Sequence, residues 1–300
     1  MRCIDGRTKV YCVLGNPVAH SVSPVFQNRF FEGMGIDGIY VPFCIQSEAE
    51  MDHAMQGLRA LGVQGINVTI PYKETVKLLM DDLDSSARMV GAVNTIRIDH
   101  GTLTGFNTDP SGFGKDYLRC TGKSLNGARI LLLGAGGSAR SVACECLRQG
   151  AEKVYIQNRS RKRAVLLVDH LSRYFSAGRI AVQEPFTRWN ELDGNIPDLV
   201  INTTPFGMEG TGETSPAASF PLEGMWPGFT QGQAGYDLIY RPAVTPLMQS
   251  AFQKGCPAWS GLGMLVMQGA ESFRIWTGME VDPDLLDETI DELQVLLNGT

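Results

Sequence analysis

Short apolar runs alternate with segments of helix length along the second half of the chain. This pattern is typical of a parallel sheet that is covered by helices on both faces. The runs predict strands at residues 130–133, 153–157, 179–183, 198–202 and 235–239. Strands separated in this way by helices or loops indicate a doubly wound α/β fold.

The first half has an alternation of its own. Apolar runs predict strands at residues 9–14, 39–44, 63–70, 93–98 and 103–106, with a hairpin turn at residues 99–101 and helices at 25–31 and 74–80. Ser47 and Glu50 have capping-box spacing, which predicts that Ser47 begins a helix. The apolar side of that helix would be Met51, Met55, Leu58 and Leu61.

Two further helices are predicted at residues 263–276 and 283–297. The first is broadly apolar, as expected of a helix that packs back onto the first half. We therefore expect two α/β domains: residues 1–109 completed by residues 263–300, and residues 110–262. Residues 209–232, which are rich in Gly, Pro, Ser and Thr, predict a long surface loop on the cofactor side of the second domain.

A glycine-rich turn joins the strand at residues 130–133 to a predicted helix at 138–149. Gly134 would allow the tight turn, Gly136 would let backbone N–H groups approach a pyrophosphate, and Ala139 would keep the helix close to the sheet. The N-terminal end of the helix favours phosphate groups. The candidate cofactor residues of this turn are Gly134, Ala135, Gly136, Gly137, Ser138 and Ala139.

The next strand ends in Asn158, Arg159 and Ser160, and Arg163 follows a helical turn later. Proteins that bind NAD usually have Asp or Glu here, which accepts a hydrogen bond from the ribose 2′-hydroxyl. Guanidinium groups suit a 2′-phosphate instead, so the sequence favours NADP. Without the glycine turn, the basic cluster would indicate only a solvated start of a helix.

Composition narrows the choice of partners. The net charge of -6 argues against a nucleic-acid partner, and no apolar run is long enough to predict a membrane span. The first residues lack the apolar core of a signal peptide, so we expect a cytoplasmic protein. The 7 cysteines are scattered without a C-x-x-C pair, which predicts reduced thiols and no metal site.

Four polar stretches follow predicted strands in the first half, at residues 20–24, 67–73, 91–95 and 107–109. Ligands of open α/β sheets bind outside the carboxyl ends of the strands. Any one stretch alone would be explained by turn or cap residues. Four of them beside a nucleotide-binding domain favour a substrate site.

Three longer motifs that contain polar stretches of this kind, at residues 15–24, 65–73 and 105–109, resemble those of the shikimate dehydrogenase family. The glycine turn, residues 158–163, 202–208, 236–242 and 263–270 also match that family in the same order, so that the resemblance spans residues 9–278. It implies NADP-dependent, reversible reduction of the ketone of 3-dehydroshikimate to shikimate, a step towards chorismate and the aromatic amino acids.

The resemblance also implies a role for individual residues. Lys73 would be the acid for ketone reduction and the base for alcohol oxidation, and Asp109 would orient its ammonium group. Ser21, Ser23 and Tyr240 would bind the substrate carboxylate. The substrate hydroxyls would be bound by Asn67, Thr69, Asn94 and Gln268. Further cofactor contacts would come from Thr203, Gly261 and Met264.

Three positions depart from the family pattern: Gln27 replaces a frequent His, Ser160 replaces Thr, and Pro110 replaces a small residue.

The nearest alternative is a quinate/shikimate dehydrogenase that prefers NAD or accepts a broader range of substrates. An alternative of another class is a catalytically idle, NADP-binding regulatory paralogue. A methylenetetrahydrofolate dehydrogenase is a more distant alternative, since it has no evident use for the Ser21 and Ser23 pair. We also consider a homodimer.

Overall fold

The computed structural model describes residues 4–184, 196–208 and 227–298. The chain divides into two compact units, residues 1–112 with 266–293 and residues 113–265 with 294–300. The boundaries between the units fall within three helices, α4 (Asp109–Thr121), α8 (Leu262–Thr277) and α9 (Pro283–Asn298). Most of the loop expected at residues 209–232 lies outside the described residues.

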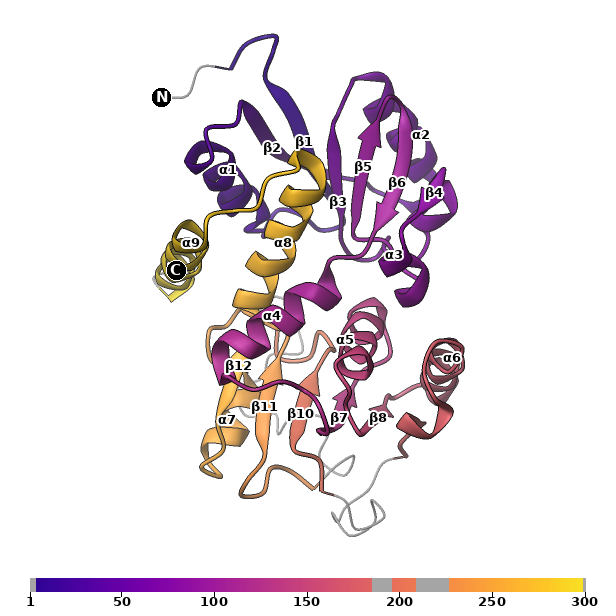
Figure 1. Ribbon diagram of the computed structural model, residues 1–300, viewed down its shortest axis with the longest axis vertical. Helices are drawn as coiled ribbons and strands as arrows, with labels where there is room; N and C mark the ends of the chain where they lie inside the picture. The colour runs from indigo at the N-terminus through magenta and orange to yellow at the C-terminus, as the bar shows by residue number, and fades with distance from the viewer. Residues whose placement is uncertain (1–3, 185–195, 209–226, 299–300) are drawn as a thin grey trace. The chain divides into compact units, whose positions relative to one another are not determined.

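The first unit contains a mixed sheet in the order β2-β1-β3-β5-β6-β4 (Figure 1). Its strands are β1 (Lys9–Gly15), β2 (Gly38–Cys44), β3 (Gly65–Val68), β4 (Asp82–Leu83), β5 (Thr95–Asp99) and β6 (Thr102–Phe106). β1 pairs in parallel with β2 and β3, whereas β5 is antiparallel to both β3 and β6. The predicted hairpin turn is confirmed, since His100 and Gly101 both have positive φ between β5 and β6.

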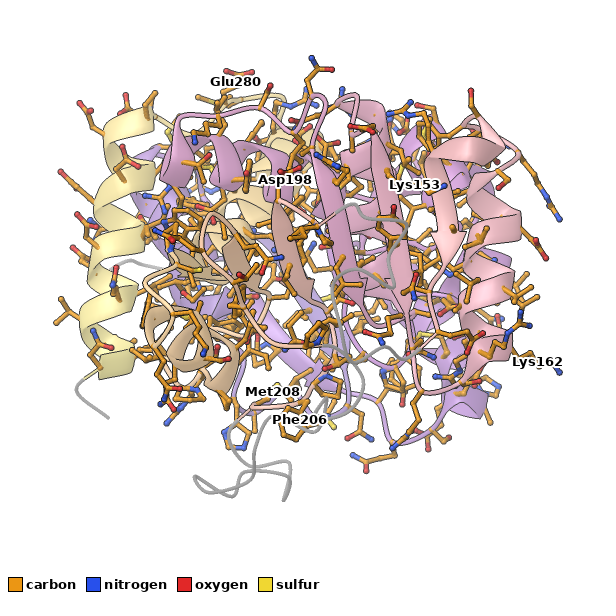
Figure 2. The ribbon with its side chains drawn as sticks, turned by 90° about the horizontal axis from the view of Figure 1, so that it is seen from below. Lys153, Lys162, Asp198, Phe206, Met208 and Glu280 are labelled. Atoms are coloured by element: carbon orange, nitrogen blue, oxygen red, sulfur yellow. The ribbon has the colours of Figure 1, made fainter. Side chains whose placement is uncertain are left out.

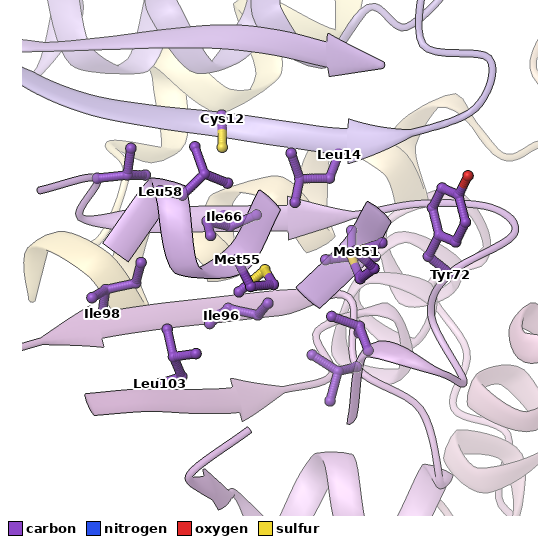
Figure 3. Packing of buried hydrophobic residues seen from close by; sticks show 14 of the residues in the cluster. Cys12, Leu14, Met51, Met55, Leu58, Ile66, Tyr72, Ile96, Ile98 and Leu103 are labelled. Atoms are coloured by element: carbon purple, nitrogen blue, oxygen red, sulfur yellow. The ribbon is translucent and has the colours of Figure 1, made fainter. Parts of the chain in front are cut away.

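One face of this sheet is covered by α2 (Met51–Ala60). Figure 3 shows Met55 of this helix close to Ile66 and Ile96 of the strands, in a cluster of buried apolar side chains. Met51 and Leu58 belong to the same cluster, so the predicted apolar side of the helix is confirmed for these residues. Leu61 is an exception, because it follows the helix and its side chain is exposed.

The other face carries aromatic side chains from α1 (Ser23–Gly33) and α8. Tyr11 of β1 stacks on Phe31, with ring centroids 4.6 Å apart. The Trp276 indole N–H donates to the Ile96 carbonyl (3.0 Å), and its ring occupies the space that a side chain at Gly65 would need. This packing places the apolar C-terminal helix on the first unit, as its sequence predicts. The helix that follows α8 in the chain is α9 (Pro283–Asn298), and its Glu288 forms an ion pair with Arg29 of α1.

The second unit contains an all-parallel sheet in the order β12-β11-β10-β7-β8-β9. Its strands are β7 (Arg129–Leu133), β8 (Lys153–Gln157), β9 (Ile180–Val182), β10 (Leu199–Asn202), β11 (Ala234–Asp237) and β12 (Ala258–Ser260). The helices between them are α5 (Gly137–Arg148), α6 (Arg161–Leu171) and α7 (Pro246–Phe252). The strand order reverses between β7 and β10, so the predicted doubly wound fold is confirmed.

Two local predictions are wrong. Residues 74–80 do not form an α-helix; they contain one 3₁₀ turn, η2 (Val76–Leu79), because the Asp81 N–H bonds to the Leu103 carbonyl and draws the chain into the sheet. Ser47 does not form a capping box either. Its side chain caps nothing, and Glu50 accepts a hydrogen bond from the Gln46 N–H (3.1 Å) before α2 begins at Met51.

Among the described residues, the short elements that were not predicted include β4, β12, α7, α3 (Ser85–Val90) and the 3₁₀ turn η3 (Ala177–Arg179). None of the described helices is long and apolar enough to cross a bilayer.

Candidate active site

Lys73 and Asp109 form an ion pair in the first unit, with Nζ 2.6 Å from Oδ2. Lys73 lies in the turn after β3, where its carbonyl accepts from the Val93 N–H (2.8 Å). Asp109 is the first residue of α4, and its N–H donates to Asn107 Oδ1 (3.2 Å). The lysine side chain keeps 20% of its surface exposed and the aspartate 7%, so the pair is reachable from solvent on the lysine side.

Asn94 holds the second oxygen of Asp109. The Thr108 N–H donates to Asn94 Oδ1 (2.8 Å), and this bond turns the amide nitrogen of Asn94 toward Asp109 Oδ1 (2.7 Å). The same nitrogen lies 3.2 Å from Gln268 Oε1. Asn94 is 1% exposed. Both oxygens of Asp109 are therefore fixed by side-chain donors, and Gln268 is tied to the same group.

Asn67 belongs to a second layer of this buried network. The Tyr40 hydroxyl, whose pKa is raised by burial, keeps its proton and donates to Asn67 Oδ1 (2.7 Å). The amide nitrogen of Asn67 consequently faces the oxygens of Thr95 (3.1 Å) and Ser272 (3.0 Å). The Thr95 and Ser272 hydroxyls are 2.7 Å apart, so strands β3 and β5 and helix α8 meet in one hydrogen-bonded cluster.

Ser21, Ser23 and Thr69 lie in the same unit, outside this cluster. The Ser23 N–H donates to Ser21 Oγ (3.3 Å) where α1 begins. Thr69 follows β3, and its methyl group fills the space beside Gly15 at the end of β1. In the described residues, no hydrogen bond between side chains joins these three residues to Lys73, Asp109 or Asn94.

Gln27 is fully buried on α1. Its amide nitrogen donates to the Gly269 carbonyl (2.9 Å), so it ties α1 to α8 one residue after Gln268. Pro110 lies in the first turn of α4, where proline is tolerated because no helical N–H bond is required.

The glycine turn of the second unit follows β7. Gly134 has φ of +116°, and a side chain there would meet Thr203 Oγ1. Thr203 in turn donates to the Leu133 carbonyl (2.7 Å). Gly136 differs, because a Cβ added to it would lie in open space. The turn is therefore closed on the Thr203 side and open at Gly136, where α5 begins at Gly137.

The remaining members of the turn are arranged as its motif predicts. Ser138 and Ala139 belong to the first turn of α5, and Ala139 is completely buried against the sheet. Ala135 is also buried.

The basic residues follow β8. Arg159 and Arg163 are exposed, and the Asn158 amide donates to the Ser160 carbonyl (2.9 Å) where α6 begins. Ser160 does not cap α6 with its side chain. Both guanidinium groups are thus presented to solvent beside the carboxyl end of β8.

Gly261, Met264 and Tyr240 lie in the segments that follow β11 and β12. Gly261 packs against the Leu238 backbone too closely to allow a side chain, and its N–H donates to the Ile239 carbonyl (3.2 Å). Met264 is buried in the first turn of α8. Burial raises the pKa of Tyr240, which therefore keeps its phenolic proton near neutral pH.

Comparison with known proteins identifies the family of this fold. Residues 13–96 match the family model of the shikimate dehydrogenase substrate binding domain, residues 118–188 that of shikimate / quinate 5-dehydrogenase, and residues 261–290 that of the shikimate 5'-dehydrogenase C-terminal domain. The NADP(+) shikimate dehydrogenase of Methanothermobacter thermautotrophicus is 37% identical and covers 96% of this chain and 97% of its own. The chain belongs to the shikimate dehydrogenase family.

Two solved structures support the same relationship. A shikimate dehydrogenase in complex with NADP+ superposes with a TM-score of 0.83 at 32% identity, over 97% of each chain. The enzyme from Thermus thermophilus, in complex with NADP(H) and shikimate, gives 0.78 at 32% identity and covers 95% of this chain and 99% of its own.

Within this shikimate dehydrogenase fold, the structure adds residues that sequence reasoning did not select: Tyr40, Thr95, Thr108 and Ser272. Ser272 could have been found, because it lies four residues after Gln268 on one helix face. Tyr40 had no such signal, since its contact with Asn67 joins two strands that are not adjacent in the sheet. Among the described residues, no group of three or more His, Cys, Asp or Glu side chains is arranged to hold a metal ion.

Proposed function

We propose that this protein catalyses the NADP-dependent, reversible reduction of 3-dehydroshikimate to shikimate, a step towards chorismate and the aromatic amino acids, in the cytoplasm. In this proposal the first unit binds the substrate and the second binds the cofactor. The observation that carries it is the Lys73 and Asp109 pair, held by Asn94 in a buried network of amides and hydroxyls.

Lys73 is the proposed proton donor and acceptor for the reacting oxygen. Its bond to Asp109 uses one of the three N–H donors of an ammonium group, and its side chain keeps a solvent-accessible surface. Asp109 orients the ammonium because both of its own oxygens are fixed. A positioned acid or base of this kind contributes roughly 10²–10⁴-fold to turnover.

The residues of the glycine turn fit a dinucleotide. The open space at Gly136, followed by the N-terminal end of α5, leaves room for phosphate groups beside backbone N–H groups. Arg159 and Arg163, exposed after β8, suit the 2′-phosphate of NADP. When bound, this cofactor supplies the hydride, and the protein supplies position and the proton.

The substrate proposal rests on the chemistry of the polar side chains in the first unit. Ser21 and Ser23 can donate hydrogen bonds to a carboxylate, as can Tyr240 of the second unit. Asn67, Thr69, Asn94 and Gln268 supply groups for the substrate hydroxyls. A site of this kind rejects analogues that lack a hydroxyl, because its own polar groups would be left unpaired.

Steady-state rates with shikimate and quinate, each with NADP and with NAD, test the proposal. We expect the highest kcat/KM for shikimate with NADP. Stronger turnover of quinate with NAD would favour the quinate/shikimate dehydrogenase alternative. Binding of NADP in a calorimeter without turnover of either acid would favour the idle paralogue. Light scattering of the same sample tests whether the protein is a homodimer.

A further inference from the structure

Asp237 is a buried carboxyl group at the carboxyl end of the second sheet. It is the last residue of β11 and is 0% exposed. It pairs in register with Asn202, the last residue of β10. Its Oδ1 accepts from the Asn202 amide (2.9 Å) and from the Ile239 N–H (3.1 Å), and the carboxyl also interacts with the Thr245 side chain.

Asn202 connects this carboxyl to the turn at residues 203–206. Its Oδ1 accepts from both the N–H (3.0 Å) and the hydroxyl (2.7 Å) of Thr204, so its amide nitrogen must face Asp237. That nitrogen also donates to the Phe206 carbonyl (3.2 Å). One amide therefore fixes the start and the end of the turn.

The same turn closes the cofactor loop. Both the N–H and the hydroxyl of Thr203 donate to the Leu133 carbonyl, at 2.9 and 2.7 Å. The Thr203 hydroxyl also occupies the space beside Gly134. Hydrogen bonds thus join Asp237 to Asn202 and Asn202 to Thr204 and Phe206 of the turn, and Thr203 of the same turn is bonded to the residue before Gly134.

In the described residues, no ion pair joins Asp237 to a side chain of the neighbouring elements. Residues 199–208 and α7 contain no ionisable group. Its own segment contains Tyr236, Tyr240 and Arg241, and Tyr236 is bonded to Asp116 of α4 (2.6 Å). Burial raises the pKa of Asp237 to about 7, against the opposite effects of Thr245, Ile239 and Asn202.

We propose that Asp237 is a positioning residue for the cofactor: acting through Asn202, it holds the turn at residues 203–206 against the glycine turn. This inference rests on the proposed use of NADP. A carboxyl in this place is costly to bury, and a neutral apolar residue would fill the space with less desolvation. Its hydrogen bonds to the Asn202 amide and the Ile239 N–H account for its presence.

Variants that alter or exchange Asn202 and Asp237 test the proposal. Asn202→Asp sets two carboxyl groups against each other and removes the donor to Phe206, so the Kd for NADP should rise about tenfold, as expected for the loss of roughly one hydrogen bond. In Asn202→Asp/Asp237→Asn the amide and the carboxyl change places, which restores the bond between the two side chains but not the donor to Phe206, so the Kd should return part of the way to that of the unmodified protein. Asp237→Asn alone keeps the acceptor oxygen and should also stay within about threefold.

The matched control is Asp198→Asn. Asp198 precedes β10 and accepts from the Arg129 N–H (2.7 Å) at the opposite end of the strand from Phe206, as Figure 2 shows. We expect no change in the Kd for NADP. In steady-state assays the KM for NADP should rise in Asn202→Asp, whereas the KM for shikimate and kcat stay within about twofold.

Calorimetry with the unmodified protein separates the two proposals. If that protein does not bind NADP, the proposed function fails. If it binds NADP and Asn202→Asp binds equally well, or if the double variant stays as weak as Asn202→Asp, the positioning role is wrong. Should Asn202→Asp not fold, Thr204→Val replaces it, because it removes one donor to Asn202, and unchanged NADP binding in that variant would overturn the role.

The pH dependence of unfolding gives a second readout. Between the ordinary pKa of 3.8 and about 7, the unfolded chain carries an ionised Asp237 while the folded protein keeps it protonated. This residue therefore lowers the free energy of unfolding as the pH rises through that window. Asp237→Asn should remove this decrease, and an unchanged slope would contradict the buried position on which the role depends.

Discussion

The polar network of the first unit and the glycine turn of the second are built by opposite means. In the network, Asn94, Asp109, Gln268, Thr95 and Ser272 hold one another through side-chain hydrogen bonds in a buried region. In the turn, the critical positions Gly134 and Gly136 have no side chain, so only backbone groups and the start of α5 are available to a ligand. One site depends on groups that are present, and the other on space that is kept free.

This difference determines how far a substitution acts. A change in the network leaves partners unpaired in a region of low dielectric, so its effect spreads to stability and to several ligand contacts. A change at the turn or at its exposed arginines alters the contact with the cofactor and little else. Four substitutions, taken from the largest expected effect to the smallest, test this distinction.

Lys73→Ala should lower turnover by roughly 10²–10⁴-fold, because it removes the proposed acid and base while Asn94 still holds Asp109. Steady-state kinetics with shikimate and NADP measures the loss. The matched control is Lys77→Ala, four residues later, whose ammonium bonds only to the Gly91 carbonyl (3.2 Å) in the described residues. Near-normal turnover of Lys73→Ala would remove this residue from the mechanism.

Asn94→Ala should lower the free energy of unfolding by about 2–4 kcal/mol, since buried partners on Thr108, Asp109 and Gln268 lose their hydrogen bonds. Denaturant unfolding measures this change. Asn158→Ala removes a more exposed amide of the second unit and should change stability by less than about 0.5 kcal/mol. Equal losses in the two variants would contradict the proposed contrast between the units.

Arg159→Ala should raise the KM for NADP by roughly 10–100-fold, as expected for loss of a charged hydrogen bond to the 2′-phosphate. The KM for NAD, which lacks that phosphate, should stay within about twofold. Arg161→Ala is the control, because Arg161 is also exposed but pairs with Glu184 (2.5 Å). A parallel loss for NADP and NAD would show that Arg159 does not recognise the 2′-phosphate.

The sequence predicted the glycine turn and the ends of the strands because these depend on local patterns. Gly134 has the positive φ that its motif requires, and the strand order reverses beside it. Lys73 and Asp109, predicted from separate stretches, lie in one ion pair. Short elements such as β4 were missed, since two residues at a sheet edge leave no periodic signal.

The second layer of the network was beyond sequence reasoning for a different reason. Tyr40, Thr95 and Ser272 come from two strands and a helix that are far apart in the chain, and only tertiary packing brings them to Asn67. The helix expected at residues 74–80 failed because Asp81 pairs with β6, a contact that local propensity does not contain.

Gly136→Ala should have the smallest effect on the protein itself. The Gly136 backbone is extended, with φ of -88°, and an added Cβ meets no atom, so the free energy of unfolding should change by less than about 0.5 kcal/mol. The KM for NADP should nevertheless rise, because the methyl group enters the space proposed for the pyrophosphate. Gly134→Ala, at φ of +116° and against Thr203, should instead lower stability by about 1–3 kcal/mol. Unchanged NADP binding in a stable Gly136→Ala protein would mean that the free space beside α5 does not hold the cofactor.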